Sequence, residues 1–279
     1  MRILLGDYNT LTVTRKVDFG IYLNGGEEGD ILMPQRYVLE GTQVGDELRV
    51  FVYLDQEERP IATTETPLAR VGEFAFLECS WVNEYGAFLS WGLMKDLFCP
   101  FREQKQRMER GKKYIVYVYI DEESYRIAAS AKVEKFLSQS LPPYAEGDEV
   151  ELLVQQKTDI GFKVIVDNQY GGLVYENQVF RQLHTGDRLK GFVAMLRHDG
   201  KLDIRLQATG RQHTIDFAEE LLQYLKTHDG VCELGDKSEA EDIKRQFQVS
   251  KKTFKRAVGD LYKRRLITVS PLKIQLQDT

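Results

Sequence analysis

Short apolar stretches alternate with polar residues through the first three quarters of the chain, and glycines separate them. Three pairs of stretches align with one another: "VDFGIYL" with "VGDELRVFVYLD", "NEYGAFL" with "RGKKYIVYVYID", and "TDIGFKV" with "TGDRLKGFVAML". In each pair two glycines stand 25 residues apart, from Gly20 to Gly45, from Gly86 to Gly111 and from Gly161 to Gly186. Three matches at one spacing indicate three copies of one domain.

Each copy has the pattern of a small β-barrel. Its stretches are short, alternate in polarity and are rich in Val, Ile, Tyr and Phe, which is typical of strands. A further strand-like piece closes each copy, as "RPIATTE", "YRIAASAK" and "KLDIRLQAT". Five strands in about 65 residues favour an OB-fold. The glycine in D-F-G, E-Y-G and D-I-G suits a strongly bent strand, which needs a residue without a Cβ.

The period changes in the last quarter of the chain. Apolar residues recur at helical spacing at Ile215, Ala218, Leu221, Leu222 and Leu225. A second helix is predicted from Ser238, which opens the capping-box pattern S-E-A-E, to Phe247. A third helix is predicted from the N-cap Ser250 to about Arg265, before a β-hairpin in "LITVSPLKIQLQ". This order of elements is that of a winged helix.

The predicted third helix has one apolar and one basic side. Steps of 100° place Phe254, Val258, Leu261 and Arg265 on one stripe, with Ala257 beside it. The opposite line holds Lys252, Arg256, Gly259 and Lys263. Such a face is either solvated surface or a contact for phosphates, with the glycine allowing a backbone to approach closely.

Charge is distributed unevenly. The net charge is −5, and residues 1–213 carry 26 Lys and Arg against 32 Asp and Glu. The segment from Lys244 to Arg265 instead carries nine basic residues and one acid, Asp260. Because affinity for phosphates depends on local potential, this segment is a candidate contact for nucleic acid.

Composition narrows the class of protein. A chain of 279 residues, 42% of them hydrophobic and 29% charged, has room for two or more ordinary domains. No apolar run reaches the ~20 residues of a membrane span and no signal peptide opens the chain, so we expect a cytoplasmic protein. Three cysteines without a C-x-x-C pair and four histidines argue against disulfides or a zinc site.

Catalytic motifs are missing from the sequence. It contains no nucleophile elbow, P-loop, H-E-x-x-H or dinucleotide fingerprint. We therefore expect a protein that is not an enzyme and needs neither a metal nor an organic cofactor.

Two levels of resemblance follow from these motifs. The aromatic-Gly-x-aromatic pattern, the Gly-Leu-Val-aromatic strand, the G-D turn and the R-I-x-x-S strand resemble the RNA-binding domain of ribosomal protein S1. In their order, "LMPQ", "VFVYLD", "IATTETP", "DLFCPF", "RIAASAK", "GFKVIVDNQYGGLVY" and "DGKLDIRLQ" resemble the bacterial conserved virulence factor B (YitL-like) family over essentially the whole chain.

The resemblance implies a mostly β multidomain fold. Three tandem S1-type OB-fold barrels are expected at 1–66, 67–140 and 141–211, and an α+β winged-helix domain at 212–279. The implied function is binding of single-stranded RNA, with a role in regulating gene expression after transcription.

Candidate stacking residues also come from the resemblance. In S1 domains, aromatic rings on the outer face of the barrel stack on unpaired bases. Matching positions beside the glycine hold Phe19, Tyr22, Tyr85 and Phe88 in the first two copies. The third copy departs, with Ile160 and Lys163 there, but has Tyr175 where the others have Pro34 and Pro100. A platform is favoured over a core position for Tyr175, and both remain open for the four aromatics.

Basic residues of the third copy and the winged helix complete the expected RNA surface. They are Lys163, Arg181, Lys190, Arg197, Lys201, Arg205, Lys244, Arg245, Lys251, Lys252, Lys255, Arg256 and Lys263. Two other functions stay open. The winged helix could make the protein a DNA-binding regulator, or the acidic barrels could dock a component of the transcription or translation machinery.

Overall fold

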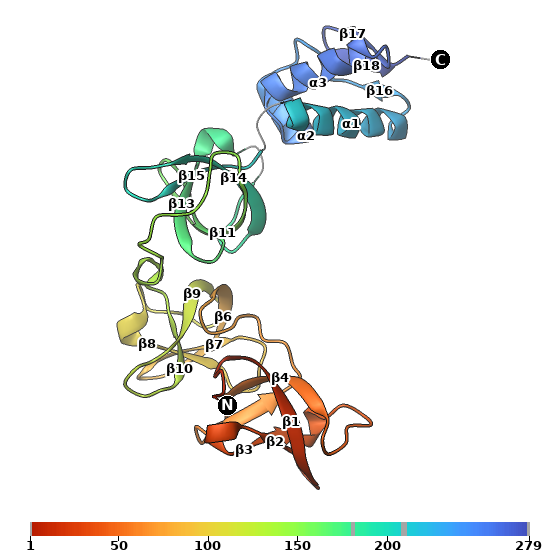
Figure 1. Cartoon of the computed structure of the whole chain (residues 1–279). Helices are drawn as coiled ribbons and strands as arrows, with labels where there is room; N and C mark the ends of the chain where they lie inside the picture. Colours follow the sequence, from red (N-terminus) through yellow and green to blue (C-terminus); the bar gives the residue numbers. More distant parts are fainter. Residues whose placement is uncertain (1, 180–181, 208–210, 278–279) are drawn as a thin grey trace. The chain divides into compact units, whose positions relative to one another are not determined.

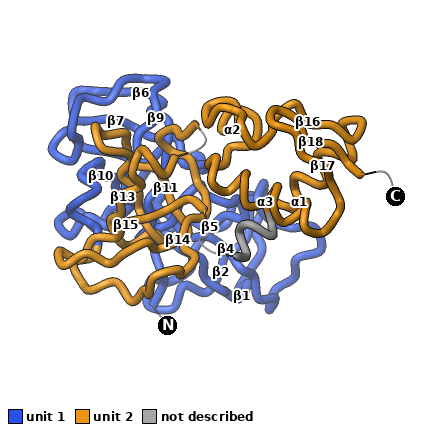
Figure 2. Tube along the Cα trace, turned by 90° about the horizontal axis from the view of Figure 1, so that it is seen from above, with its two compact units in different colours: residues 1–137 blue, residues 138–279 orange. Residues whose placement is uncertain are grey.

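The structure is a computed structural model that describes residues 2–179, 182–207 and 211–277, with the backbone alone described at 211–216. The predicted site residue Arg181 lies outside the described residues. The chain forms two compact units, residues 1–137 and 138–279 (Figure 2). The first unit contains two barrels, and the second contains a third barrel and the winged helix.

Three closed five-stranded barrels follow one another along the chain (Figure 1). The first has β1 (Asp7–Val17), β2 (Gly20–Asn24), β3 (Asp30–Pro34), β4 (Glu47–Leu54) and β5 (Pro60–Thr63). The second has β6 (Phe74–Val82), β7 (Gly86–Ser90), β8 (Leu97–Pro100), β9 (Lys113–Ile120) and β10 (Ile127–Ser130). The third has β11 (Glu149–Thr158), β12 (Gly161–Val166), β13 (Tyr170–Tyr175), β14 (Arg188–Leu196) and β15 (Leu202–Arg205). The predicted mostly β class with OB-type barrels is confirmed.

The three barrels share one topology. Within each, the third and fifth strands pair in parallel and the other neighbours are antiparallel. A 3₁₀ turn follows the third strand in every copy, as η2 (Gln35–Tyr37), η3 (Phe101–Glu103) and η5 (Glu176–Gln178). Two further 3₁₀ turns are η1 (Gly26–Glu28) and η4 (Val133–Lys135).

The repeated glycine opens the second strand of each barrel. A Cβ on Gly20, Gly86 or Gly161 would overlap a carbonyl oxygen of the third strand, from Met33, Cys99 or Val174 respectively. Close approach of the neighbouring backbone, rather than the predicted strand bend, thus explains the glycine.

A β-bulge recurs in the first strand of every barrel. The register shifts between Val13 and Arg15, between Cys79 and Trp81, and between Val154 and Gln156. A bulge inserts one residue, so side chains after it exchange faces. In β6, Leu77 and Cys79 are buried whereas Trp81 is 45% exposed.

The first two barrels share part of their apolar interior. Phe51 and Tyr53 lie in β4 of the first barrel, yet both belong to the buried cluster of the second. The ring of Phe51 is 5.9 Å from that of Trp91 and 5.5 Å from that of Tyr8. Apolar burial of this kind couples the stability of two domains, so the first unit is expected to unfold as one. The predicted domain limits stay a prediction.

The last part of the chain is an α+β winged helix, as predicted. It consists of α1 (Arg211–Thr227), β16 (Val231–Cys232), α2 (Ala240–Phe247), α3 (Lys251–Lys263), β17 (Ile267–Ser270) and β18 (Lys273–Leu276). The sheet order is β16-β18-β17, so β18 pairs with both other strands.

One predicted detail of the winged helix is confirmed and two others are wrong. Ser250 caps α3, because its Oγ accepts the N–H of Thr253 at 3.1 Å, as predicted. The capping box at Ser238 is wrong: α2 starts at Ala240, and Ser238 Oγ instead accepts the N–H of Gly235 at 2.8 Å. Arg265 is also wrong as a member of the apolar stripe, since it is exposed and lies beyond α3 with φ +58°.

Buried thiols occur in both units. Cys79, Cys99 and Cys232 are free and buried, and burial raises the pKa of the Cys99 thiol to about 12. In the described part of the chain, no cluster of His, Cys, Asp and Glu could hold a metal ion. None of the helices described is both long and apolar enough to cross a membrane.

Replacement of Phe51 by alanine tests the shared interior. Phe51→Ala should destabilise the first unit by about 3–5 kcal/mol, because it removes a fully buried ring. Alkylation of Cys79 and Cys99, in the second barrel, should then accelerate by about a hundredfold or more, while Cys232 keeps its rate. Mass spectrometry of the labelled peptides measures each thiol separately.

Leu152→Ala, in the interior of the third barrel, is the control and should leave Cys79 and Cys99 protected. Unchanged protection of both thiols in Phe51→Ala would contradict the coupling of the two barrels.

Candidate nucleic-acid interface

Three aromatic side chains form a row across the outer face of the second barrel. Trp81 of β6 pairs with Phe88 of β7, which pairs with Phe98 of β8. The rings of Trp81 and Phe88 are stacked, with centroids 3.8 Å apart and planes 3° from parallel. The ring of Phe98 follows at 5.0 Å from that of Phe88. We name these three residues the aromatic row.

The other barrels hold different residues at the same register positions. The equivalent row of the first barrel is Arg15, Tyr22 and Leu32. The equivalent row of the third barrel is Gln156, Lys163 and Leu173. The second barrel therefore offers three rings where the first has one and the third has none.

The predicted aromatics of the first barrel are partly covered by their neighbours. Phe19 is 58% exposed and meets Tyr22 edge to face, with centroids 6.4 Å apart. The guanidinium of Arg15 lies over the ring of Tyr22 at 4.0 Å and is 3.5 Å from the carboxylate of Asp30. A base could stack on Tyr22 only by displacing Arg15, whereas Phe19 is open.

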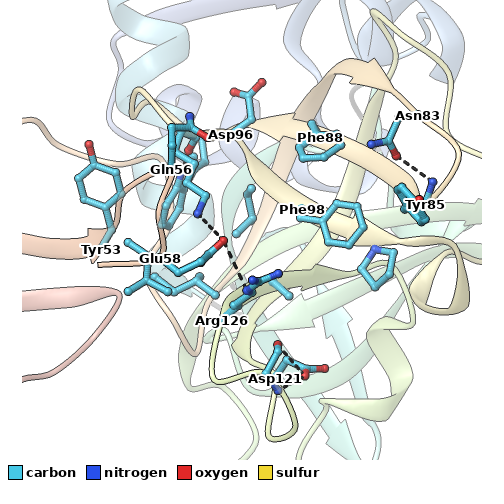
Figure 3. Close-up of a pocket in the computed structure, with 18 of the residues that line it drawn as sticks. Tyr53, Gln56, Glu58, Asn83, Tyr85, Phe88, Asp96, Phe98, Asp121 and Arg126 are labelled. Carbon is cyan, nitrogen blue, oxygen red and sulfur yellow. Dashed lines mark hydrogen bonds and ion pairs between the residues drawn. The ribbon is translucent and has the colours of Figure 1, made fainter. Parts of the chain in front are cut away.

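A groove of about 740 Å³ lies beside the aromatic row. Its volume is in the range of sites for small organic ligands. Figure 3 shows Phe88, Phe98 and Tyr85 on one side of it and Tyr53, Gln56 and Glu58 on the other. Tyr85 is 66% exposed, and Asn83 Oδ1 accepts its backbone N–H at 2.8 Å. Both barrels of the first unit thus contribute to one aromatic-lined site.

Cations in the groove are paired with acids. Lys95 Nζ donates to Glu58 Oε1 at 3.0 Å, and Arg126 Nε lies 3.4 Å from the same oxygen. Arg102 binds Asp121 at 3.0 Å and lies 3.7 Å from the carboxylate of Glu123. The groove therefore presents rings and hydrogen-bonding groups, with little excess positive charge.

Tyr175 lies on the outer face of the third barrel. Val174 points into the core, and Leu173 and Tyr175 on either side of it are half-buried. The Tyr175 hydroxyl accepts a hydrogen bond from Arg197 Nη2 at 2.6 Å, and Arg197 also binds Asp203 at 2.6 Å. The hydrogen bond to Asp203 raises the pKa of the Arg197 guanidinium. The ring is thus held at the surface, and its stacking role remains a prediction.

Most candidate cations of the third barrel have acidic partners. Ion pairs join Lys190 to Glu149 at 2.6 Å, Lys201 to Asp199 at 3.3 Å and Arg205 to Glu146 at 3.5 Å. Lys163 is exposed on β12, whereas the side chain of Arg205 is only 13% exposed. These pairs reduce the positive potential that the residue count of this barrel suggests.

The winged helix presents cations of two kinds. Lys255 pairs with Asp236 at 3.0 Å and Arg245 pairs with Asp242, while Lys244 is exposed near the end of α2. A second group on α3 has no ion pair within the described residues, namely Lys251, Lys252, Arg256 and Lys263. Open space lies above Gly259 between them. This face of α3 fits a polyanion better than the third barrel does.

Several aromatics at the surface were not singled out from the sequence. Trp81 and Phe98 complete the aromatic row, and Tyr262 is 59% exposed on α3. The alternation of "DLFCPF" puts Phe98 on the opposite face from buried Leu97 and Cys99, so that signal was available. No comparable signal marked Trp81, because strict alternation from Leu77 and Cys79 predicts an inward side chain.

Comparison with known proteins agrees with this architecture. An S1 domain model matches residues 5–65, and a CvfB-like winged helix domain model matches residues 219–276. The uncharacterized protein YitL of Bacillus subtilis is 28% identical over 268 residues, which cover 92% of this chain and 89% of YitL. Conserved virulence factor B of Staphylococcus saprophyticus is 24% identical over 241 residues, covering 84% and 81%.

A solved structure is similar over the full length. It is a multidomain protein with nucleic acid binding domains from Streptococcus pneumoniae, 20% identical, with 98% of both chains covered and a TM-score of 0.44. Neither matched domain model describes a catalytic domain.

Fold and domain matches together define the class: tandem S1-type barrels followed by a winged helix, domains of nucleic-acid-binding proteins. The predicted resemblance to the conserved virulence factor B (YitL-like) family is confirmed over most of the chain.

Tyr175→Phe tests whether the hydroxyl anchors the third barrel. The change removes an acceptor for the charged Arg197, so the free energy of unfolding of this barrel should fall by about 1–2 kcal/mol. Hydrogen exchange at residues 149–205, read by mass spectrometry, should accelerate accordingly. Tyr85→Phe is the matched control, because the Tyr85 ring is exposed, and should leave exchange unchanged. Equal exchange in Tyr175→Phe and the native chain would show that the hydrogen bond adds no stability.

Proposed function

We propose that this chain binds single-stranded RNA in the bacterial cytoplasm and regulates gene expression after transcription. The observation that carries the proposal is the aromatic row on the second barrel. Rings on an outer strand face bind nucleic acid by stacking on bases, and only unpaired bases can splay onto such a platform. In a duplex the bases already stack on one another, so the row favours single strands.

The exposed face of α3 supplies the electrostatic part of the proposal. Lys251, Lys252, Arg256 and Lys263 would follow the phosphates, because each is available to replace a condensed counterion. The third barrel and the remaining candidates of the winged helix would extend this contact. We propose that the third barrel and the winged helix, which make up the second unit, form one composite RNA-binding surface.

Two competing functions give different outcomes in one experiment. The basic face of α3 is also what a duplex DNA reader would need, and the acidic barrels could dock a protein instead. Titration of labelled single-stranded RNA, single-stranded DNA and duplex DNA with the full chain, followed by fluorescence anisotropy, separates these possibilities. We expect RNA single strands to bind more tightly than duplex DNA. Tighter binding of the duplex would favour the DNA regulator, and no binding of any of them would favour a protein scaffold.

Trp81→Ala should weaken RNA binding by about 1–3 kcal/mol, the value of one base–aromatic contact. The fold should remain intact, since Trp81 lies outside the core. Leu68→Ala is the control: Leu68 is 63% exposed and lies outside the aromatic row. Equal losses of affinity in both variants would remove the support that the row gives to RNA binding.

Charge removal on α3 should change the salt dependence of binding. Lys252→Ala and Arg256→Ala should each lower the slope of log K against log salt by about 0.7, because one phosphate contact is lost on a single strand. Arg264→Ala is the matched control, since Arg264 is paired with Glu219 at 2.6 Å and Asp260 at 3.4 Å. Affinities measured over a series of salt concentrations give the slopes. A slope that stays the same in both α3 variants would mean that this face only contacts solvent.

A further inference from the structure

The groove beside the aromatic row holds one carboxylate without a partner. Asp96 lines the groove and is half-buried, and its side chain has no hydrogen bond or ion pair within the described residues. The cations of the groove already have acidic partners; they are Lys95, Arg102 and Arg126. One negative charge in the groove is therefore left for a ligand to neutralise.

An excess of acid extends over the whole first unit. Residues 1–137 carry 17 of the 38 Lys and Arg and 22 of the 43 Asp and Glu, which leaves 21 of each for residues 138–279. The first unit thus has a net charge of −5, and the second unit has none. Because a negative potential attracts cations and repels phosphates, the first unit suits a positively charged partner.

Large side chains at the surface line the same groove. Trp81, Tyr85 and Met94 are each at least 45% exposed. Tyrosine, tryptophan and methionine are enriched where proteins bind other proteins. The face of an aromatic ring also attracts cations, and a planar guanidinium can stack on a ring while it binds a carboxylate. Rings and the unpaired Asp96 in one groove therefore suit an arginine side chain.

A tyrosine at the edge of the groove has an unfavourable backbone conformation. Tyr125 stands between the lining residues Ser124 and Arg126, is 75% exposed and has φ +55°. The equivalent turn of the third barrel has Gly200 at this position, with φ +78°. Glycine adopts this conformation at little cost, whereas other residues persist in it mainly at functional sites. An exposed ring at such a position indicates that Tyr125 contacts a ligand.

The size and the polar groups of the groove favour an extended chain over a single small cation. Its volume of about 740 Å³ exceeds that of one guanidinium group. The amides of Gln56 and Asn83 lie at two sides of it (Figure 3), and Gln56 makes no hydrogen bond within the described residues. Side-chain amides both donate and accept, so they can bind the backbone N–H and C=O groups of a peptide.

We propose that this groove docks an extended, arginine-containing segment of a partner protein, with a guanidinium bound to Asp96 and stacked on a ring of the groove. Tyr125 contacts the same segment at the edge. The inference goes beyond the proposed function, because the ligand is a protein and no phosphate takes part. Phe88 and Phe98 line the groove and also belong to the aromatic row, so the segment and an RNA base compete for these rings.

A short peptide of alternating arginine and glycine tests the groove in the full chain. Anisotropy of the labelled peptide measures binding, and the unlabelled peptide should change the fluorescence of Trp81, since the other tryptophan, Trp91, is buried. The matching peptide with lysine has the same charge but no planar cation, so it should bind about threefold more weakly. Free arginine amide should bind more weakly than either peptide, because it fills only part of the groove.

Asp96→Asn should lower the affinity for the arginine peptide about tenfold, because a charge-assisted hydrogen bond is lost. Asp159→Asn is the matched control: Asp159 is exposed on the third barrel, and its replacement changes the net charge equally. The control should leave the affinity unchanged. Tyr125→Gly should lower it about threefold. This variant introduces the residue that the turn prefers, so the thermal midpoint should stay the same or rise, and a loss of binding cannot come from unfolding.

Equal affinity for the arginine and lysine peptides overturns the inference, as do equal losses in Asp96→Asn and Asp159→Asn, since binding then reports only net charge. Free arginine amide binding as tightly as the peptide also overturns it and assigns the groove to a small cation.

Titration of single-stranded RNA in the absence of peptide separates the inference from the proposed function. Asp96→Asn should bind RNA at least as tightly as the native chain, because a negative charge beside the row is removed. Weaker RNA binding would place RNA at Asp96 and overturn the inference. Peptide binding by a chain that binds no RNA supports the inference and rejects only the proposed function.

Discussion

Close approach of the third strand to the start of the second is the constraint on which each barrel depends. A side chain at Gly20, Gly86 or Gly161 would occupy the position of a backbone carbonyl, so only glycine allows the strands to pair there. The pairing that results sets the glycine opposite Pro34 in the first copy and Tyr175 in the third. Every outward position on the second and third strands then follows from the two-residue period, including Phe88 and Phe98 of the aromatic row.

Local patterns of the sequence were sufficient for the architecture. Glycine spacing and alternation identified the barrels, and helical periodicity identified the buried side of α3, because both depend on residues close in the chain. The inward side chains of Phe254 and Leu261 follow from that periodicity, and the cap at Ser250 follows from a serine directly before the helix. Ser238 matched a cap pattern, but its hydroxyl serves the turn at Gly235 instead.

Features that depend on tertiary structure could not be predicted. The bulge in β6 turns the side chain of Trp81 outward, although the alternation of the strand predicts an inward position. No residue type in the segment predicts a bulge there. Phe51 fits a β-strand of the first barrel, and only packing places it against Trp91 of the second. Counting cations was misleading for the same reason: Lys190 and its partner Glu149 are 41 residues apart along the chain. The sequence made α3 look basic, and four of its cations, Lys251, Lys252, Arg256 and Lys263, have no ion pair within the described residues, whereas Lys255 pairs with Asp236.

Equivalence of the three outward rows has a consequence for what each barrel can bind. Arg15, Trp81 and Gln156 occupy one register position after the same bulge, yet each barrel closes equally well. Residues at this position do not belong to the buried core of their barrels, so mutation there leaves folding largely intact. The three copies can therefore differ in what they bind while they keep one scaffold. The same tolerance makes the row transplantable, and an engineer could give the third barrel the rings of the second by substituting surface positions alone.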